Sequence, residues 1–406
     1  MNTVAQGNRP FQAFFIFYFS TVQRREKSAI RYTQGDQTIE EHLMTDRHRV
    51  YTKVKKTLKR MMKLNHQGQV VTLAMMISGI VLSRNAQLSM MSSEIPSERK
   101  EKSIEMRMRR WVKDGIDVEA VYMPFARQIL EALSHLPLVL VMDGSQAGRG
   151  CMVLMVGVLY QKRALPIAWL VYKGKKGHTS AERHKHVLEK VLPLLPEGSE
   201  VVLLGDAEYD TTAMIEWVEK NTLWKYVLRT SPQIYVRTDQ QEQPIREYPL
   251  EKGKVLFLPQ AGFTQTAALT LNVVGWWASR YEEPIFMVTN LDSPYPACRY
   301  YKRRFRIETF FSDQKSRGFH IHKSHLADPV RLSRLLIAAC LAYIWMIAQG
   351  LQVMAANNTS LIDRTERIDK SLFRLGMDWL KYALKNNLYF EPFFHFQPLT
   401  SIVNVR

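Results

Sequence analysis

The sequence predicts an α/β protein with a mixed sheet, a helical region before that sheet and a β-rich insertion within it. Between residues 136 and 230, short apolar runs alternate with amphipathic segments in the order β-β-β-α-β-α-β, which favours a mixed sheet with flanking helices. Residues 46–135 show helical periodicity instead. Residues 231–284 break the alternation and contain several strand-like runs.

Composition indicates a globular protein with a basic surface. The chain has 406 residues, of which 46% are hydrophobic, enough for two or three domains. Its formal net charge of +18 points to an anionic partner, most often nucleic acid, although a solvated basic surface is the simpler alternative. Cys151, Cys298 and Cys340 are far apart, which predicts neither a zinc site nor a disulfide and fits a reducing cytosol.

The first residues differ in character from those that follow. A basic amphipathic stretch begins at Met44, so we expect translation to start there and residues 1–43 to be a mis-assigned start or a disordered extension. The longest uninterrupted apolar run, residues 335–348, has 14 residues. A bilayer span needs roughly 20 residues, so this run favours a buried core helix and no membrane partner.

Residues 44–135 are interpreted as a helical DNA-binding domain. The stretches VYTKVKKTLKRMMKL and SERKEKSIEMRMRRWVKDG predict basic helices, the second ended by Gly115, and an apolar helix lies between them. Such helices are typical of small DNA-binding bundles, but the sequence shows no helix-turn-helix signature.

The next residues predict the sheet and its helices. LPLVLVMDGSQ indicates a buried strand with Asp143 at its exit, and a hairpin around residues 161–163 follows. EVVLLGDAEYD repeats the form, with Asp206 just past a buried strand. Beyond the insertion, IFMVTNL predicts one more strand, and residues 351–406 form a C-terminal helical region.

A second pattern joins a carboxylate to two cations and a phenol. Tyr301, Arg304, Glu308 and Lys315 lie in one stretch that predicts a helix starting after Pro294 and Pro296. At about 100° per residue, the four positions share an arc of roughly 60° on one helix face. The alternative is a solvated row of surface ion pairs.

Three carboxylates can share one site. If the strands before Asp143 and Asp206 are neighbours, both side chains lie at the same sheet edge, and Glu308 is the third candidate. Three converging carboxylates repel one another unless a hard cation lies between them. Two Mg²⁺ ions, roughly 3.5–4 Å apart, are the usual arrangement at a phosphodiester.

The motifs together resemble a DDE transposase of the bacterial insertion-sequence class that carries the Tyr-Arg-Glu-Lys signature. Asp143 lies in MDGSQ, Asp206 in LLGDAEYD and Glu308 in YYKRRFRIETFFSDQK, and the signature matches without gaps. The resemblance covers roughly residues 44–390.

The resemblance implies an RNase H-like catalytic domain at residues 136–230 and 285–350, carrying a β-rich insertion at 231–284. It implies a transposase that binds the terminal inverted repeats of its element, synapses two ends as a homodimer and moves by cut-and-paste through a DNA hairpin. It also implies a location in the bacterial cytoplasm, at the nucleoid.

The resemblance also assigns roles to residues. Asp143, Asp206 and Glu308 would bind two Mg²⁺ ions, for which Mn²⁺ can substitute, and the other signature residues would contact DNA phosphates. In hairpin-forming relatives a tryptophan stacks on a flipped base, a role open to Trp276 or Trp277. The DNA-contacting set is Tyr301, Arg304, Lys315, Trp276 and Trp277.

Several alternatives stay open at this point. Asp143 precedes Gly144 and can simply be a turn residue. Glu208 or Asp210 can replace Asp206, although Asp210 also suits a helix N-cap. The two tryptophans can both be core residues. For the whole chain, the rivals are a metal nuclease of the same superfamily and a catalytically silent DNA-binding regulator.

Overall fold

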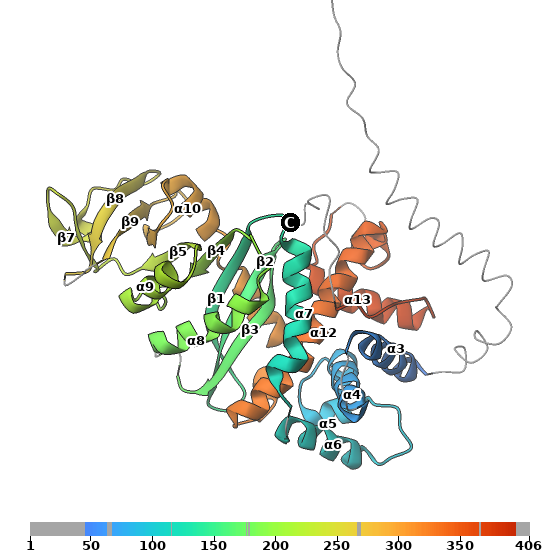
Figure 1. The fold of residues 1–406 in the computed structure, drawn as a ribbon. Coiled ribbons are helices and arrows are strands. Elements are labelled where there is room, and N and C mark those ends of the chain that lie inside the picture. Colours follow the sequence, from blue (N-terminus) through green and yellow to red (C-terminus); the bar gives the residue numbers. More distant parts are fainter. Residues whose placement is uncertain are drawn as a thin grey trace, which may run out of the picture. The chain divides into compact units, whose positions relative to one another are not determined.

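A computed structural model describes residues 45–62, 67–114, 116–175, 177, 179–265, 269–364 and 367–394 (Figure 1). The expectations for residues 1–43 lie outside this range. The described chain divides into two units after residue 50, and the second unit extends from residue 51. The expected domain boundary near residue 135 lies inside the second unit, whose fold is described below.

The first described elements are helices, as the periodicity of residues 46–135 predicts. Asp117 caps the last of them by accepting hydrogen bonds from the amides of Glu119 and Ala120. The helices are α3 (Asp46–Met61), α4 (Gln67–Ser83), α5 (Leu88–Ser92), α6 (Glu101–Lys113) and α7 (Val118–Leu133). Helices α4, α6 and α7 pack against α12, so they share a core with the sheet that follows.

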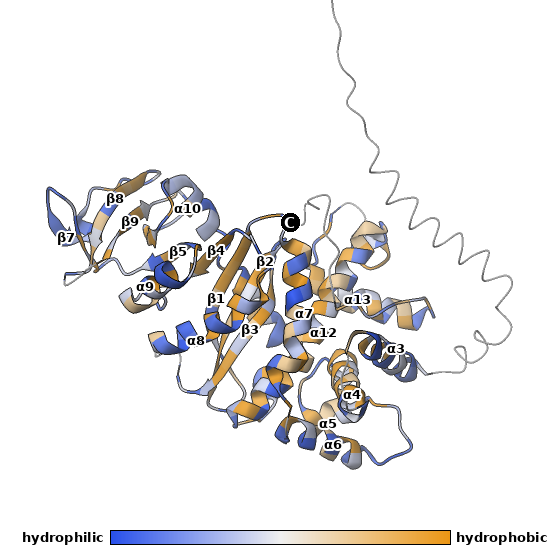
Figure 2. Cartoon of the chain, viewed as in Figure 1, coloured by the Kyte–Doolittle hydropathy of each residue, from blue (hydrophilic) through white to orange (hydrophobic). Residues whose placement is uncertain are grey.

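Ten strands form one mixed sheet in the order β3-β2-β1-β4-β5-β10-β9-β8-β6-β7. The pairs β1–β4 and β4–β5 are parallel and the others are antiparallel. The strands are β1 (Leu138–Ala147), β2 (Cys151–Tyr160), β3 (Arg163–Lys173), β4 (Val201–Gly205), β5 (Lys225–Thr230), β6 (Tyr235–Arg237), β7 (Glu242–Pro244), β8 (Val255–Phe263), β9 (Leu269–Trp276) and β10 (Ile285–Thr289). Strand β4 is buried along its whole length, as its apolar run predicts (Figure 2).

The expected β-rich insertion extends the main sheet. Strands β8 and β9 form a hairpin, and β9 also pairs with β10, which in turn pairs with β5. The hydrogen-bonded ladder therefore continues from the parallel strands into the insertion.

The remaining helices cover the sheet. Trp169 of β3 contacts Tyr122 of α7 and Ser333 of α12, whereas Tyr172, three residues on, contacts Arg183 of α8. Because side chains alternate along a strand, α8 lies on the opposite face from α7 and α12. These elements are α8 (Ala181–Val191), η1 (Leu192–Leu194), α9 (Thr212–Asn221), η2 (Ile245–Glu247), α10 (Pro294–Tyr301), α11 (Arg306–Gln314), η3 (Ile321–Lys323), α12 (Pro329–Ala355), η4 (Thr359–Leu361) and α13 (Leu372–Lys385).

Helix α12 contains the apolar run expected to be a core helix. By length and composition it could cross a membrane, but 89% of its most apolar window is buried inside the protein. It packs against α13, α4 and β3, which accounts for its apolar character.

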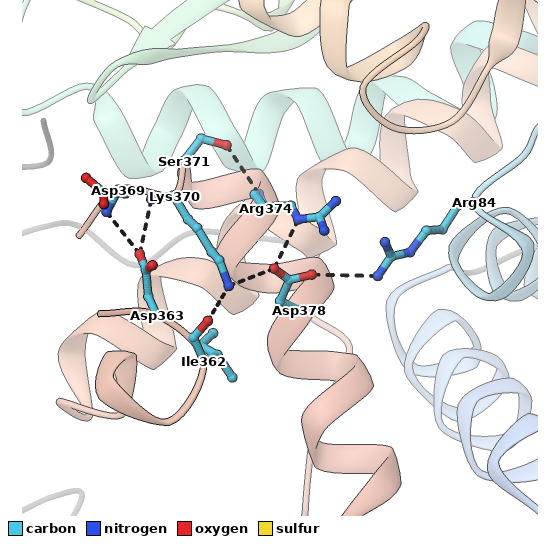
Figure 3. A network of polar contacts seen from close by, with 8 residues as sticks. All are labelled: Arg84, Ile362, Asp363, Asp369, Lys370, Ser371, Arg374 and Asp378. Atoms are coloured by element: carbon cyan, nitrogen blue, oxygen red, sulfur yellow. Dashed lines mark hydrogen bonds and ion pairs between the residues drawn. The ribbon is translucent and has the colours of Figure 1, made fainter. Parts of the chain in front are cut away.

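An ion-pair network joins α13 to α4 and to the loop between α12 and α13 (Figure 3). The Asp378 carboxylate accepts hydrogen bonds from Arg374 at 3.0 Å and lies 3.0 Å from the Lys370 ammonium and 3.7 Å from the Arg84 guanidinium. Asp363 accepts two backbone hydrogen bonds from the same loop, from Asp369 and Lys370. One partly buried carboxylate therefore connects three segments that are distant in sequence.

Candidate functional site

The parallel pairing of β1 with β4 places two of the predicted carboxylates side by side. Val141 of β1 pairs with Leu204 of β4, so Asp143 and Asp206, each two residues further, reach equivalent positions. The expected strand exit is correct for Asp206 and wrong for Asp143. Strand β1 continues to Ala147, because its antiparallel partner β2 extends the ladder beyond β4.

The Asp143 side chain lies on the face of the sheet that α11 covers. A methyl group on its neighbour Gly144 would meet the Tyr209 hydroxyl at 3.5 Å. Successive residues of a strand point to opposite faces, so Tyr209 lies on the face opposite to the Asp143 side chain. Asp143 shares its face with Ser145, whose hydroxyl accepts a 2.6 Å hydrogen bond from Lys315. Lys315 therefore lies within two residues of Asp143 along the strand.

The predicted continuous helix through the signature is wrong. Helix α10 ends at Tyr301 and α11 begins at Arg306, so Arg304 lies in the turn between them and Lys315 follows α11. The turn contains short i to i−3 backbone hydrogen bonds, such as Arg304 to Tyr301. The chain breaks here because α10 packs against β5, β8 and β9, whereas α11 packs against β1 and β3.

Arg304 holds the site together despite the broken helix. Its guanidinium donates a 2.8 Å hydrogen bond to Glu308 and lies 3.8 Å from the Asp206 carboxylate. Its side chain is 12% exposed, against 56% for Glu308 and 37% for Asp206. Two carboxylates from different elements therefore face one nearly buried cation.

The electrostatics bring the third carboxylate into the same group. Burial disfavours the charge on Arg304, but this effect is outweighed and its pKa is raised. The groups that raise the pKa are Tyr301, Asp206, Asp143 and Glu308. The charges of all three predicted acids therefore favour the charged form of Arg304, which itself contacts Asp206 and Glu308.

Tyr301 is part of the same cluster but is 7% exposed. Burial raises the pKa of its phenol to about 12, with the Arg304 charge acting in the opposite direction. Its ring centroid lies 5.8 Å from the Arg304 guanidinium. The phenol is therefore neutral at physiological pH, and its buried ring lies beside the Arg304 guanidinium.

The two local rivals of Asp206 have other surroundings. Glu208 accepts a 3.0 Å hydrogen bond from the Thr179 amide, which fixes the start of the segment before α8. Burial raises the pKa of Asp210 to about 6. The suggested N-cap role of Asp210 is wrong, because the cap residue of α9 is Thr211.

The donor chemistry of the site fits a hard divalent cation, since Asp206 and Glu308 both reach one positive group and carboxylate oxygens are the ligands that Mg²⁺ prefers. In the part of the chain that the structure describes, however, no three Asp, Glu, His or Cys side chains are grouped closely enough to hold a metal ion. Arg304 lies between the carboxylates instead.

The two tryptophans of the insertion both make contacts within the protein. Trp276 ends β9, is 8% exposed and packs edge-on against Tyr281 at 5.2 Å, with the Lys302 ammonium 5.3 Å from its ring. Trp277 follows the strand, is half-buried and donates a hydrogen bond to the Tyr281 carbonyl. Their stacking on a flipped base stays a prediction.

Sequence reasoning missed Arg229, which lies 3.7 Å from the Asp206 carboxylate. It follows Leu228 on β5, and Leu228 pairs with Gly205 immediately before Asp206. Only the strand pairing reveals this contact. Arg306, at the start of α11, donates a hydrogen bond to the Gln161 carbonyl in the β2–β3 turn.

Comparison with known proteins assigns the family. A family described as "Transposase DDE domain" matches residues 125–345, which is more than half of the chain, and the chain belongs to this family. The match includes Asp143, Asp206 and the whole Tyr301–Lys315 signature. No curated protein matches the chain.

Two solved structures give weaker likenesses. One is a piggyBac transposase synaptic complex with hairpin DNA, which is 10% identical, has a TM-score of 0.41 and matches over 84% of this chain and 77% of that one. The other is an Argonaute from Aquifex aeolicus, which is 11% identical, has a TM-score of 0.24 and matches over 50% of this chain and 28% of that one. Neither likeness is close enough to support an argument about function.

Proposed function

We propose that this protein is an active DNA transposase in which Asp143, Asp206 and Glu308 direct metal-dependent cleavage and joining of DNA strands. One observation carries the proposal, namely the contact of a single guanidinium, that of Arg304, with both Asp206 and Glu308. Acids that share one cation in the free protein are placed to share divalent cations beside a phosphodiester.

The three acids would hold the divalent ions, with Mg²⁺ as the expected cofactor and Mn²⁺ as its substitute. Two bound ions would activate the attacking oxygen and stabilise the leaving oxygen. The first step is hydrolysis, in which a new bond from a water oxygen to phosphorus replaces the bond to the 3′ oxygen. The 3′-OH then attacks a phosphodiester of target DNA, and its new bond to phosphorus replaces the bond to the target strand's own 3′ oxygen, which leaves as a 3′-OH.

The cations of the site would hold the substrate. Arg304 presents a planar guanidinium suited to a bidentate phosphate contact, Arg229 lies beside the same Asp206 carboxylate, and Lys315 bonds Ser145 two residues from Asp143. A phosphate bound at the three acids would therefore have cations available to it. Tyr301, being buried and neutral, would position Arg304 and leave direct phosphate contact to the cations.

The decisive experiment is strand cleavage of a duplex taken from the DNA that flanks the gene, with Mg²⁺ or Mn²⁺. Asp143→Asn, Asp206→Asn and Glu308→Gln should each lower the cleavage rate by about 100-fold or more, because metal assistance contributes several kcal/mol. Glu182→Gln, at an exposed position of α8, is the matched control and should cleave normally. Full cleavage by any of the three variants contradicts the proposal.

Further parts of the proposal concern the whole reaction. A homodimer would bind the terminal inverted repeats of the element in the bacterial cytoplasm. Excision of the element would pass through a DNA hairpin, with Trp276 or Trp277 stacking on a flipped base. Trp276→Ala and Trp277→Ala, compared by separating hairpin from nicked products, would test the stacking role.

Two rival functions need different tests. A joining assay with pre-cleaved ends separates the transposase from a metal nuclease. End binding without cleavage by the wild type would indicate a silent regulator.

A further inference from the structure

The segment that follows the site, residues 315–327, has an unusual charge distribution. It contains Lys315, Arg317 and Lys323 together with three histidines, and it has no acidic residue. The next carboxylate, Asp328, caps α12 by accepting a 2.8 Å hydrogen bond from the Arg331 amide. The segment therefore lacks a carboxylate of its own to neutralise its cations.

The β1–β2 turn adds one more cation to this segment. The Arg149 amide donates a 2.7 Å hydrogen bond to the Leu326 carbonyl. Gly148 makes this approach possible, because it has a φ of +62° and a methyl group there would meet the Leu326 carbonyl oxygen at 2.5 Å. The turn and the segment are thus held together by backbone contact.

The same segment is fixed at other points. The Ala86 amide donates a 2.7 Å hydrogen bond to the Phe319 carbonyl, and the short helix η3 packs against β1. We call the exposed side chains of Arg149, Arg317 and Lys323 the basic ridge. In the described ranges of the chain, no carboxylate forms an ion pair with any of the three.

Exposed cations that lie on one segment and on the turn bonded to it, and that form no ion pair, favour a polyanion, whose phosphates neutralise several charges at once. The ridge lies beside the candidate site, since Lys315 begins the segment and bonds Ser145, two residues from Asp143. We propose that the basic ridge binds the backbone of the DNA duplex as it leaves the site. This inference rests on the proposed function.

The strand geometry predicts where on the DNA this contact falls. From Asp143 to the end of β1 at Ala147 is four residues, or about 13 Å at roughly 3.3 Å per residue. A DNA strand advances about 3.4 Å per nucleotide, so a duplex that follows the direction of β1 would meet the ridge at phosphates about four nucleotides from the cut.

The first test measures binding of a fluorescein-labelled 30-base-pair duplex of arbitrary sequence across a range of salt concentrations. With Arg149, Arg317 and Lys323 all replaced by alanine, the slope of log K against log salt should become shallower by about 2 to 3, since each phosphate contact contributes about 0.9. The matched control replaces Lys162, Lys381 and Lys385, which are equally exposed but lie elsewhere, and should keep the wild-type slope. Circular dichroism checks that both variants are folded. If the triple variant is not folded, the single variant Lys323→Gln replaces it in the test, with an expected slope change of about 1.

The second test locates the contact on a duplex that the protein cleaves. Neutral methylphosphonates at the third to fifth phosphates from the cut should weaken binding by the wild type and leave binding by the ridge variant unchanged. A ridge variant with the wild-type slope and the wild-type sensitivity to methylphosphonates overturns the inference, while the proposed function stands. A wild type that binds no duplex overturns the proposed function itself.

Discussion

Arg304 is the residue on which the candidate site depends. It comes from a turn, is nearly buried, and contacts the carboxylate that follows β4 and one on α11 through one guanidinium. An arginine cannot lose its proton, so in the free protein it supplies a permanent counterion that offsets the repulsion between Asp206 and Glu308. Divalent cations and Arg304 would therefore compete for the same oxygens.

Replacing Arg304 should consequently strengthen metal binding by the free protein. Two partly exposed ion pairs contribute about 1 kcal/mol together, which corresponds to about a fivefold tighter Kd for Mn²⁺ in Arg304→Ala. Isothermal titration without DNA measures this change. Arg303→Ala is the control, because that residue makes no ion pair with the three acids in the described part of the chain. Unchanged or weaker Mn²⁺ binding by Arg304→Ala would refute the competition.

His184 is a second residue with a measurable consequence. Its ring is fully buried against Tyr209, and neither ring nitrogen has a hydrogen-bond partner within the described residues. Burial lowers its pKa to about 4, whereas an unfolded histidine titrates near its usual value of 6.5. Between these values the unfolded state binds a proton that the folded state does not, so stability is present above pH 6.5 and is lost as the pH falls toward 4.

Chemical denaturation at a series of pH values should therefore show a loss approaching about 1.4 kcal/mol per pH unit within that window from this residue. His184→Phe keeps a ring beside Tyr209 and should remove this part of the slope. An identical pH profile for the two proteins would show that His184 does not set it.

At the scale of elements, the packing of α12 against α13 depends on glycines. A methyl group on Gly376 of α13 would meet the Met346 carbonyl oxygen at 1.9 Å, and one on Gly350 of α12 would meet the Leu372 carbonyl oxygen at 2.1 Å. Both conflicts involve backbone atoms, so a side chain cannot simply move aside. The two helices approach closely only because these positions lack a Cβ atom.

Gly376→Ala should therefore lower the free energy of unfolding by about 1–3 kcal/mol, the usual cost of overpacking. Gly68→Ala on α4 is the matched control, because its nearest atom would be the Arg107 guanidinium nitrogen at 3.9 Å. That variant should be neutral or more stable, since alanine is the better helix former. Urea denaturation compares the two, and equal stability would contradict the packing argument.

The predicted helix face of the signature holds over a short distance only. The prediction that Arg304 and Glu308 lie together is confirmed, because residues four apart meet over a single turn. The prediction of one helix face from Tyr301 to Lys315 is wrong, because α10 and α11 pack on different strands and the chain turns between them. Lys315 still reaches the site, but through Ser145 of β1 and not along a helix face.

At the scale of the whole molecule, the net charge of +18 is the property that most clearly indicates an anionic partner. The structure shows that this charge is organised. Within the described residues, Arg304 and Arg229 lie beside Asp206, Lys315 bonds Ser145, and the basic ridge lies on the segment that Lys315 begins, which has no acidic residue. Positive groups therefore occur both at the candidate site and on the segment that follows it.

The sequence by itself determined the α/β class, the helical front and the buried apolar helix, because periodicity is a local property, and its spacing led to the proposal of the three acids. Only the tertiary structure decided that Asp143 lies within a strand, that the insertion extends the main sheet, and that Arg229 joins Asp206. Those features depend on which strands pair and in what register, and residues far apart in sequence settle both. The broken signature helix has the same cause, since its two halves follow the surfaces they cover.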